Sequence, residues 1–298
     1  MRFPNQPLRM QKKRALFIIN PISGGKNKDK LPSLIDQILD KSKYDYEIVF
    51  TERPGHASEL SAQSGYDCFI SVGGDGTINE VARNLVHSKA AMGILPQGSG
   101  NGLSRHVGIH MNVEKAIAQL NTAKEILMDT CSINGNVFVN MAGVGFDAHI
   151  GKVFAESKER GFKTYVVKTL TEYNAYKPQL YTLNYDNQEL KTNAFLISFA
   201  NSSQYGNNAY IAPDAAINDG LLEICMLKPF SVFSLPGIGI RLFNKTIKQS
   251  KYFQTVKAKS LVLERESEGV AHLDGEPMNF GKKLEIKVIP QSLRLLVP

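Results

Sequence analysis

Three glycine-rich stretches stand out, because each contains a hydroxyl side chain and directly follows an apolar, strand-like run. They are residues 21–25 (PISGG), 73–77 (GGDGT) and 96–102 (PQGSGNG). Glycine lets a backbone approach a ligand closely and exposes its N–H groups, and the hydroxyls of Ser23, Thr77 and Ser99 add donors. A helix that begins after the second stretch would add the positive end of its dipole. Together the stretches predict a polyphosphate-binding site.

Asp75, in the middle of the second stretch, is unexpected there, because a carboxylate repels phosphate. It would have a chemical role if it held Mg²⁺ against the phosphates or took the proton of an incoming hydroxyl. The alternative is an aspartate that only forms a turn. A Walker A loop is excluded, since Gly25-Lys26 is followed by Asn27. The GxGxxA pattern at 143–148 lacks the return strand of a dinucleotide-binding unit.

The elements that must position these stretches change in character along the chain. Over the first 96 residues, helix-like segments alternate with apolar runs at 15–20, 46–50, 68–72 and 92–95. This alternation is typical of a mainly parallel, doubly wound α/β sheet, in which loops after neighbouring strands share one edge. After about residue 126, strand-like runs follow one another, interrupted by a helix-like stretch at about 152–176 and a basic segment at 230–250. We therefore expect a second domain of mostly antiparallel β structure.

Composition restricts the class of protein. Of the 298 residues, 43% are hydrophobic and 21% are charged, as in ordinary globular proteins. No apolar run reaches the roughly 18 residues of a spanning helix, and the first 14 residues lack the apolar core of a secretory signal. We expect a soluble, intracellular protein with reduced, buried cysteines. The net charge is +7, and residues 228–259 contain seven Lys or Arg and no acid, which suits an anionic partner.

The ordered set of motifs resembles the diacylglycerol kinase catalytic-domain family, which includes soluble bacterial diacylglycerol kinases and the sphingosine and ceramide kinases. The matching segments are Asn20-Pro21-x-Ser23-Gly24, 51–57 (TERPGHA), 73–77, 98–101 (GSGN), 140–148 (NMAGVGFDA), 212–223 and Asp274-Gly275-Glu276. GGDGT alone is also found in NAD kinases and phosphofructokinases, so the resemblance rests on the ordered set. The GSGN form of the third loop is closer to the sphingosine and ceramide kinases.

The resemblance implies two domains with ATP in the cleft between them. We expect residues 1–126 to form the α/β nucleotide-binding domain and residues 127–289 the β-rich lipid-substrate domain, with the tail at about 290–298 returning to the first. Carried over position by position, the ATP contacts would be Asn20, Pro21, Ser23, Gly24, Thr51, Gly73, Gly74, Asp75, Gly76, Thr77, Gly98, Ser99 and Asn101.

The resemblance also implies catalytic, metal and substrate residues. Glu276 matches the general base of the bacterial enzymes, whereas Asp75 matches the residue given that role in sphingosine kinases. A structural Mg²⁺ would use Asp219 with the backbone carbonyls of Ala216 and Leu221. For the lipid headgroup, Asp147 and His149 are the candidate contacts, although an aspartate that begins a helix explains Asp147 nearly as well.

The expected function is an ATP- and Mg²⁺-dependent kinase for a hydroxyl of a membrane lipid: diacylglycerol, a sphingoid base or a ceramide-like lipid. A soluble metabolite kinase of the NAD kinase type is the alternative, and a non-catalytic binder is a third hypothesis. We expect a cytoplasmic protein at the inner face of the membrane, with an anionic membrane surface as partner, no nucleic acid and a possible homodimer. The candidate docking segments are 231–251, which mixes apolar and basic residues, and 162–177.

Overall fold

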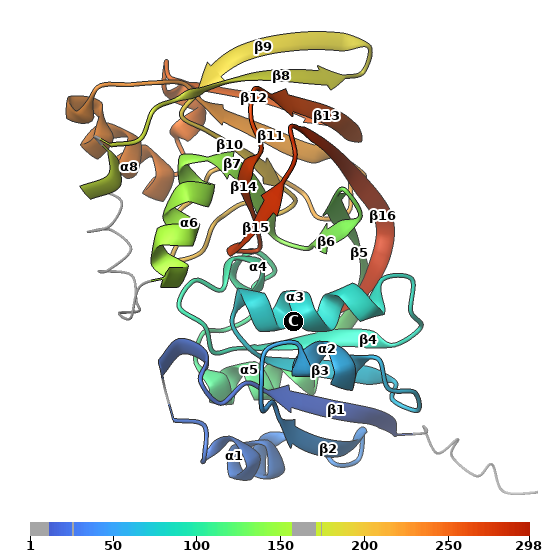
Figure 1. Cartoon of the computed structure of the whole chain (residues 1–298). Coiled ribbons are helices and arrows are strands. Elements are labelled where there is room, and N and C mark those ends of the chain that lie inside the picture. Colours follow the sequence, from blue (N-terminus) through green and yellow to red (C-terminus); the bar gives the residue numbers. More distant parts are fainter. Residues whose placement is uncertain (1–11, 26, 157–170, 174) are drawn as a thin grey trace, which may run out of the picture.

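The computed structural model describes residues 12–25, 27–156, 171–173 and 175–298. It has an α/β half and a β-rich half, one above the other in Figure 1. Most of the helix expected at 152–176, and most of the docking candidate at 162–177, lie outside the described residues. No helix in the described part of the chain is long and apolar enough to span a bilayer.

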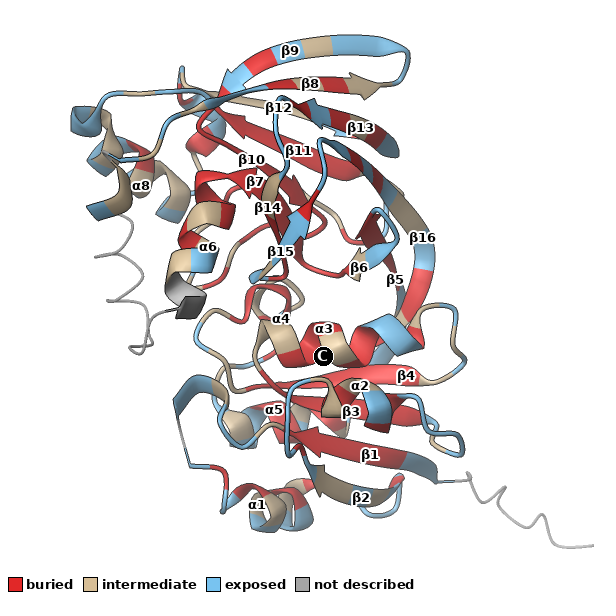
Figure 2. Cartoon of the chain, viewed as in Figure 1, coloured by how far each residue is buried: buried red, intermediate tan, exposed pale blue. Residues whose placement is uncertain are grey.

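The α/β half is built around four parallel strands in the order β2-β1-β3-β4. Their bounds are Lys13–Ile19 (β1), Tyr44–Phe50 (β2), Cys68–Gly73 (β3) and Ala91–Pro96 (β4). Helices α2 (His56–Ser61) and α3 (Asp75–Leu85) cover one face, and α1 (Leu31–Ile38) and α5 (Val113–Leu120) the other (Figure 1). Buried on both faces, β3 and β4 have no exposed residue, which explains why they are apolar throughout (Figure 2).

The β-rich half contains an antiparallel sheet of six strands in the order β12-β11-β10-β7-β14-β15. Their bounds are Met141–Gly145 (β7), Leu196–Ala200 (β10), Leu222–Leu227 (β11), Phe253–Ala258 (β12), Gly269–Leu273 (β14) and Glu276–Phe280 (β15). One face packs on β8 (Gln179–Tyr185), β9 (Gln188–Ala194) and β13 (Ser260–Arg265), enclosing a core that includes Phe138, Tyr181 and Phe199. The other face is covered by α6 (Phe146–Glu156) and α8 (Leu235–Phe243).

One long strand joins the two halves. β16 (Lys283–Val297) pairs with β13 at its start and with β4 at Leu295, and it pairs with β5 (Lys124–Ile133) on both sides of a register shift. The buried carboxylate of Asp129 accepts from the backbone N–H of Gln291 inside that irregular segment, at 2.7 Å. The last strand therefore runs along the β-rich half and ends beside β4 of the α/β half (Figure 1).

The remaining elements are short. They are β6 (Asn136–Phe138), α4 (Gly102–His106) and the 3₁₀ turns η1 (Ser23–Gly25), η2 (Val232–Ser234) and η3 (Ile247–Gln249). The fold class expected from the sequence, a mainly parallel α/β sheet followed by antiparallel β structure, is confirmed. The division at residue 126 stays a prediction, and that residue lies inside β5.

Candidate active site

The three glycine-rich loops lie together, because they follow β1, β3 and β4, which are neighbours in the sheet. The Ser23 hydroxyl of the first loop donates to the carbonyl oxygen of Gln97 in the third, at 3.2 Å. Asn20 donates from Nδ2 to Oγ1 of Thr77, at 3.0 Å, which ties the first loop to the second. A backbone bond of 2.7 Å from Gln97 N to Gly73 O joins the second and third. The sequence correctly placed these loops on one edge.

Glycine is required where two of these loops touch. Gly24 has φ +62°, and a Cβ there would lie 2.1 Å from the carbonyl oxygen of Gln97. A Cβ on Gly98 would lie 2.4 Å from the Cα of Gly74. No side chain fits at these distances, so the backbones of all three loops meet directly.

Asp75 begins α3 and caps the next short helix, α4. Its Oδ2 accepts from the backbone N–H of Asn101 and its Oδ1 from that of Gly102, each at 3.1 Å. Asn101 stands in the left-handed region, with φ +56°, and its side chain closes the loop onto Gly98. The pKa of Asp75 is raised to about 6, first by burial and then by the Asp274 carboxylate, while the backbone N–H groups of Asn101 and Gly102 act to lower it. The carboxylate predicted to do chemistry therefore also shapes the third loop.

Asp274 anchors the turn between β14 and β15 to the α/β half. Its buried carboxylate accepts four hydrogen bonds: from Asn79 Nδ2 of α3, and from the backbone N–H groups of Val139, Asn140 and Met141, at 2.8 to 3.0 Å. Burial raises its pKa, and these four donors lower it. The residue is at φ +50° and is followed by Gly275 at φ +87°, a tight turn that aims the next residue back at α3.

Glu276 begins β15, and its carboxylate lies against the second glycine loop. Oε1 would be 2.7 Å from a Cβ built on Gly76, so the absence of a side chain at Gly76 makes room for this carboxylate. The residue as a whole is exposed, but desolvation of its carboxylate beside the loop raises its pKa. Arg83 opposes this shift, and the carboxylates of Glu80 and Asp274 add to it. The two residues named from sequence as candidate bases thus flank the same loop.

These carboxylates bear on where Mg²⁺ would be held. Within the described residues, no group of three His, Cys, Asp or Glu side chains converges as a complete metal site. The Asp274 carboxylate nevertheless acts to raise the pKa of both Asp75 and Glu276, which indicates an excess of negative charge that a cation would relieve. Mg²⁺ is commonly bound by one or two carboxylates together with phosphate oxygens, and this arrangement fits that mode.

The turn predicted to hold a structural Mg²⁺ is built differently. Oδ1 of Asp219 accepts from the backbone N–H of Leu221 at 3.0 Å, and its Oδ2 is 3.2 Å from Nζ of Lys257. The Gly220 N–H donates to Asp129 at 2.7 Å. Both oxygens of Asp219 are engaged and its charge is compensated, so the turn does not fit a cation held by Ala216, Asp219 and Leu221. That magnesium site stays a prediction.

Of the two predicted substrate contacts, Asp147 belongs to a buried polar cluster. Its Oδ2 accepts from Ser198 Oγ at 2.9 Å and is 3.2 Å from His272 Nε2, and the hydroxyl of Tyr205 contacts both Asp147 and Ser198. Nδ1 of His272 is buried without a hydrogen-bond partner in the described structure. The ring of His149 lies 6.3 Å from that of Phe146, and its Nε2 is 2.9 Å from Glu172 Oε2. No sequence motif had pointed to Ser198, Tyr205 or His272.

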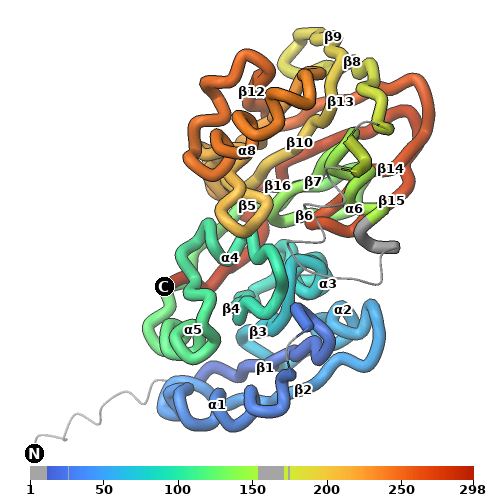
Figure 3. The backbone as a smooth tube through the Cα atoms, turned by 90° about the vertical axis from the view of Figure 1, so that its left-hand side faces the viewer, coloured from blue at the N-terminus to red at the C-terminus, as the bar shows by residue number. Residues whose placement is uncertain are grey.

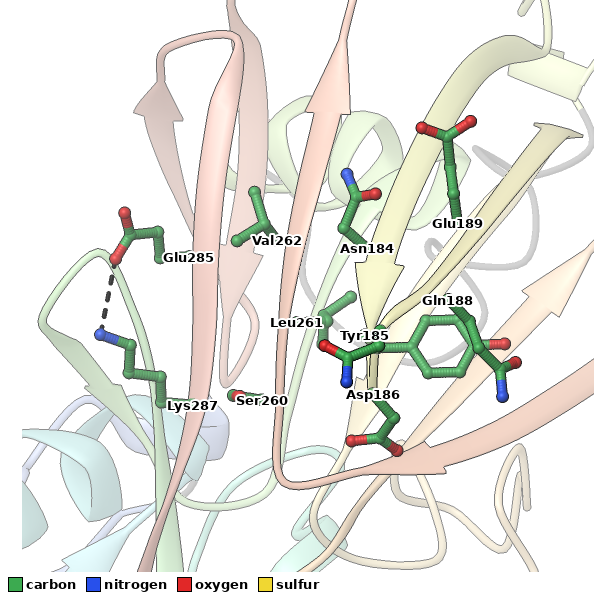
Figure 4. Close-up of a pocket in the computed structure, with 11 residues that line it drawn as sticks. Asn184, Tyr185, Asp186, Gln188, Glu189, Ser260, Leu261, Val262, Glu285 and Lys287 are labelled. Atoms are coloured by element: carbon green, nitrogen blue, oxygen red, sulfur yellow. Dashed lines mark ion pairs between the residues drawn. The ribbon is translucent and has the colours of Figure 1, made fainter.

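Two hollows lie on the described surface. One, of about 680 Å³, adjoins the first glycine loop and is lined by Pro21, Ile22, Gly25, Asn27, Lys28, Asp29 and Phe50. Lys28 is buried there and donates to the Ser23 carbonyl at 2.6 Å, so it fixes this loop. The other, of about 530 Å³, lies between β8, β9, β13 and β16 and contains no residue of the three glycine loops (Figure 4).

Most of the predicted nucleotide contacts therefore share one edge of the sheet. Thr51 is buried at the end of β2, where its N–H donates to Ile19 at 2.8 Å, while Ser99 is exposed in the third loop. The residues that lock the arrangement were missed: Asn79 of α3, Asn140 after β6, and Arg265. The guanidinium of Arg265 donates to four backbone carbonyls at the open end of the β14–β15 hairpin. Their partners are distant in sequence, which gives no local signal.

Comparison with known protein families matches both halves of the chain. Residues 14–133 match the diacylglycerol kinase catalytic domain, and residues 140–297 match the YegS C-terminal NAD kinase beta sandwich-like domain. A protein named "Probable lipid kinase YegS-like" from Enterobacter sp. (strain 638) is 29% identical over 299 residues, covering 95% of this chain and 96% of the relative. "Probable lipid kinase YegS" from Escherichia coli (strain SMS-3-5 / SECEC) is 28% identical with the same coverage.

Solved structures agree on the fold. One from Bacillus anthracis str. Sterne has a TM-score of 0.78 at 22% identity and covers 100% of this chain and 99% of its own. A second from the same organism, described as a diacylglycerol kinase, has a TM-score of 0.76 at 21% identity, covering 97% and 98%. Both halves, with their relative arrangement, are therefore shared with these structures.

Proposed function

Because the chain belongs to the YegS-like family with a diacylglycerol kinase catalytic domain, we propose that it transfers the γ-phosphate of ATP to a hydroxyl of a membrane lipid. The acceptor is a lipid with a free hydroxyl at its polar end, such as diacylglycerol, a sphingoid base or a ceramide-like lipid. The observation that carries the proposal is the convergence of the three glycine loops with the Asp274-Gly275-Glu276 turn. A phosphate site and a carboxylate that can accept a proton are thereby brought together.

The loops bind the triphosphate through backbone N–H groups and through the hydroxyls of Ser23, Thr77 and Ser99. The hollow beside the first loop, lined in part by Phe50 and Asn27, is the candidate position for the nucleoside. The carboxylates near the second glycine loop, together with phosphate oxygens, would hold Mg²⁺, which would supply positive charge against the charge that builds up on the transferred group. The hydrogen bond from Lys28 Nζ to the Ser23 carbonyl holds the first loop in place.

Glu276 is the better placed proton acceptor. Both carboxylate oxygens of Asp75 already accept from amides of the third loop, whereas Glu276 makes no hydrogen bond in the described structure. As the lipid oxygen attacks the γ-phosphorus, its proton passes to Glu276 and the bond from phosphorus to the ADP oxygen breaks. A raised pKa suits this role, because a base works best when its pKa is near the working pH. Asp75 is then a positioning residue that holds α4 and the third loop.

The substrate side is formed by the β-rich half. Asp147 lies on α6, whose first turn follows β7, the strand paired with β14 of the Asp274 turn. The buried cluster of Asp147, Ser198, Tyr205 and His272 supplies polar groups at the base of an aromatic layer that includes Phe146 and Phe195. Polar groups bordering aromatic side chains suit a molecule with a polar head and an apolar tail. His149, predicted with Asp147, is the outer of the two candidates.

The test is a transfer assay with ATP labelled at the γ-phosphate. Diacylglycerol, sphingosine and ceramide in mixed micelles are compared with NAD in solution, and products are separated by thin-layer chromatography. Label in a lipid product that is lost in Glu276→Gln, but not in the exposed control Glu285→Gln, supports the proposal. Label in NAD and in none of the lipids would instead assign the chain to the soluble metabolite kinases.

A further inference from the structure

The helix α8 is apolar on two opposite faces, although only one of them is buried. Ile238 is 5% exposed and packs with Leu242 on the core beneath α6. On the opposite side, Ile240 is 60% exposed and Phe243 is 48% exposed. Arg241 is the single charged residue of the helix. A helix that is apolar all round is normally buried on all sides, so the outer face of α8 lacks a partner among the residues that the structure describes.

The turn before α8 extends this apolar face. Phe233 is 92% exposed and Val232 is 43% exposed, the former more than any other large hydrophobic side chain of the described residues. Phe233 of η2 and Ile240 and Phe243 of α8 are thus exposed within one short stretch of chain. Four large exposed apolar side chains in one stretch exceed the scattered single residues that ordinary surfaces show. These four residues are called the α8 patch below.

Basic residues surround the α8 patch. Lys228, Arg241, Lys245 and Lys251 make no ion pair within the described part of the chain, while Lys248 is neutralised by Asp214 and Glu223. Nζ of Lys245 lies 4.4 Å from the ring centre of Tyr210, and that of Lys251 lies 5.1 Å from that of Tyr252. Residues 228–259 contain no acid, and their ion pairs in the described structure involve only Lys248 and Lys257. A segment that combines exposed aromatic and aliphatic side chains with unpaired cations suits an anionic bilayer surface.

The position of the α8 patch fits a lipid-derived substrate. Phe230, five residues before α8, packs in the aromatic layer, with its ring 5.1 Å from that of Phe195 and 5.4 Å from that of Tyr173, and Ile238 of α8 belongs to the same core cluster. Phe146 of the same layer is followed by Asp147 of the buried polar cluster. Figure 3 looks onto the face that carries α8 and shows it above α4, the helix that follows the third glycine loop. The α8 patch thus begins two residues after Phe230 of the aromatic layer, which adjoins the buried polar cluster.

We propose that the α8 patch docks the protein on an anionic membrane, with Phe233 and Ile240 entering the interface and Lys245 and Lys251 contacting acidic headgroups. This deepens the proposed function, since it names the surface that brings a lipid kinase to its substrate. The docking itself needs neither ATP nor catalysis, so it is tested separately.

The test is sedimentation with vesicles of phosphatidylcholine, alone or with about 30% phosphatidylglycerol, without nucleotide. The wild type sediments with the anionic vesicles, and raising the salt from about 0.05 M to about 0.5 M releases it. F233S/I240S lowers the partition coefficient about tenfold or more, and K245Q/K251Q does the same on anionic vesicles only. The matched controls are Leu180→Ser, exposed on β8, and Lys282→Gln, exposed before β16; both bind as wild type.

Equal binding by the wild type and F233S/I240S, or equal loss in the Leu180→Ser control, overturns the proposal. So does a wild type that light scattering shows to be a dimer which F233S/I240S splits, because a second copy would then cover the α8 patch. Activity on a short-chain, water-soluble diacylglycerol separates the two hypotheses. The patch variants keep that activity if both hold, whereas vesicle binding without any transfer to lipid would leave docking intact and refute the kinase assignment.

Discussion

Replacing Asp274 by asparagine tests whether one buried carboxylate holds the two halves of the site together. The side chains have the same shape, so Asp274→Asn removes only the charge and one acceptor oxygen. In the wild type, Oδ1 accepts from the N–H groups of Asn140 and Met141, and Oδ2 accepts from Val139 N and Asn79 Nδ2. At best, the oxygen of the new amide keeps one pair of these hydrogen bonds. Its NH₂ group then faces the other two N–H donors, which lose their acceptor.

The number of hydrogen bonds lost sets the decrease in stability. Two buried N–H groups lose their acceptor, and each such loss costs about 1–3 kcal/mol, so the free energy of unfolding falls by about 2–6 kcal/mol. For a chain of this length, about 2 °C per kcal/mol corresponds to a melting temperature at least about 4 °C lower. Glu276 lies two residues beyond, and its displacement from Gly76 lowers kcat about tenfold to hundredfold, even at temperatures at which the variant is folded.

Thermal unfolding followed by circular dichroism measures the first effect, and lipid phosphorylation well below the melting temperature measures the second. Asp186→Asn is the matched control, because Asp186 stands at φ +46° in the β8–β9 turn, as Asp274 does at +50°, but is exposed. It leaves stability within about 0.5 kcal/mol of wild type. An Asp274→Asn protein as stable and as active as the wild type would refute the anchoring role.

Three further predictions follow from other contacts. Glu276→Gln lowers kcat about 10²- to 10⁴-fold while the melting temperature stays the same, because no hydrogen bond is lost; parallel kinetics and unfolding check this. The rate rises as the pH rises through about 6, because Asp75 is protonated below its raised pKa and then cannot accept from both amides of the third loop; a pH–rate profile flat from about 5 to 8 would contradict it. EDTA leaves the melting temperature of the ATP-free protein unchanged, since Lys257 already pairs with Asp219. In Lys257→Met, MgCl₂ raises the melting temperature, because the Asp219 carboxylate has lost its partner. A wild type whose melting temperature falls on addition of EDTA would contradict the prediction.

The α/β half could be predicted from sequence because its signals are local. Each of β1, β3 and β4 is a short, mainly apolar run that leads into a glycine-rich stretch, so the strands, their parallel direction and the shared edge all follow from one pattern. Even there, α3 begins at Asp75, inside the second glycine-rich stretch and not after it. The second glycine loop therefore ends in a helix whose first side chain is the catalytic candidate itself.

The contacts that complete the site were beyond sequence reasoning. Asn79 and Asp274 are 195 residues apart, and no local pattern distinguishes Asn79 from other polar residues of an amphipathic helix. Likewise Arg265 pairs with backbone carbonyls, which any sequence supplies, so neither its burial nor its partners could be inferred. The motif around Asp274 was identified by resemblance alone, and the structure supplies its physical reason: the aspartate anchors the turn, and the glutamate points at Gly76.

The third glycine loop belongs to both halves of the molecule. On one side, Asp75 of α3 holds its amides; on the other, the N–H of Asn207 donates to the Gly100 carbonyl at 3.2 Å, and Gly206 packs directly on Gly100. A ligand that orders this loop therefore stabilises contacts to the β-rich half as well as to α3. Since a ligand that binds only the native state stabilises every element coupled to its site, an ATP analogue should raise the unfolding temperature of both halves together. The geometry of the third glycine loop then depends on both halves of the molecule. Under the proposed function, nucleotide and lipid would meet at a junction that both halves stabilise.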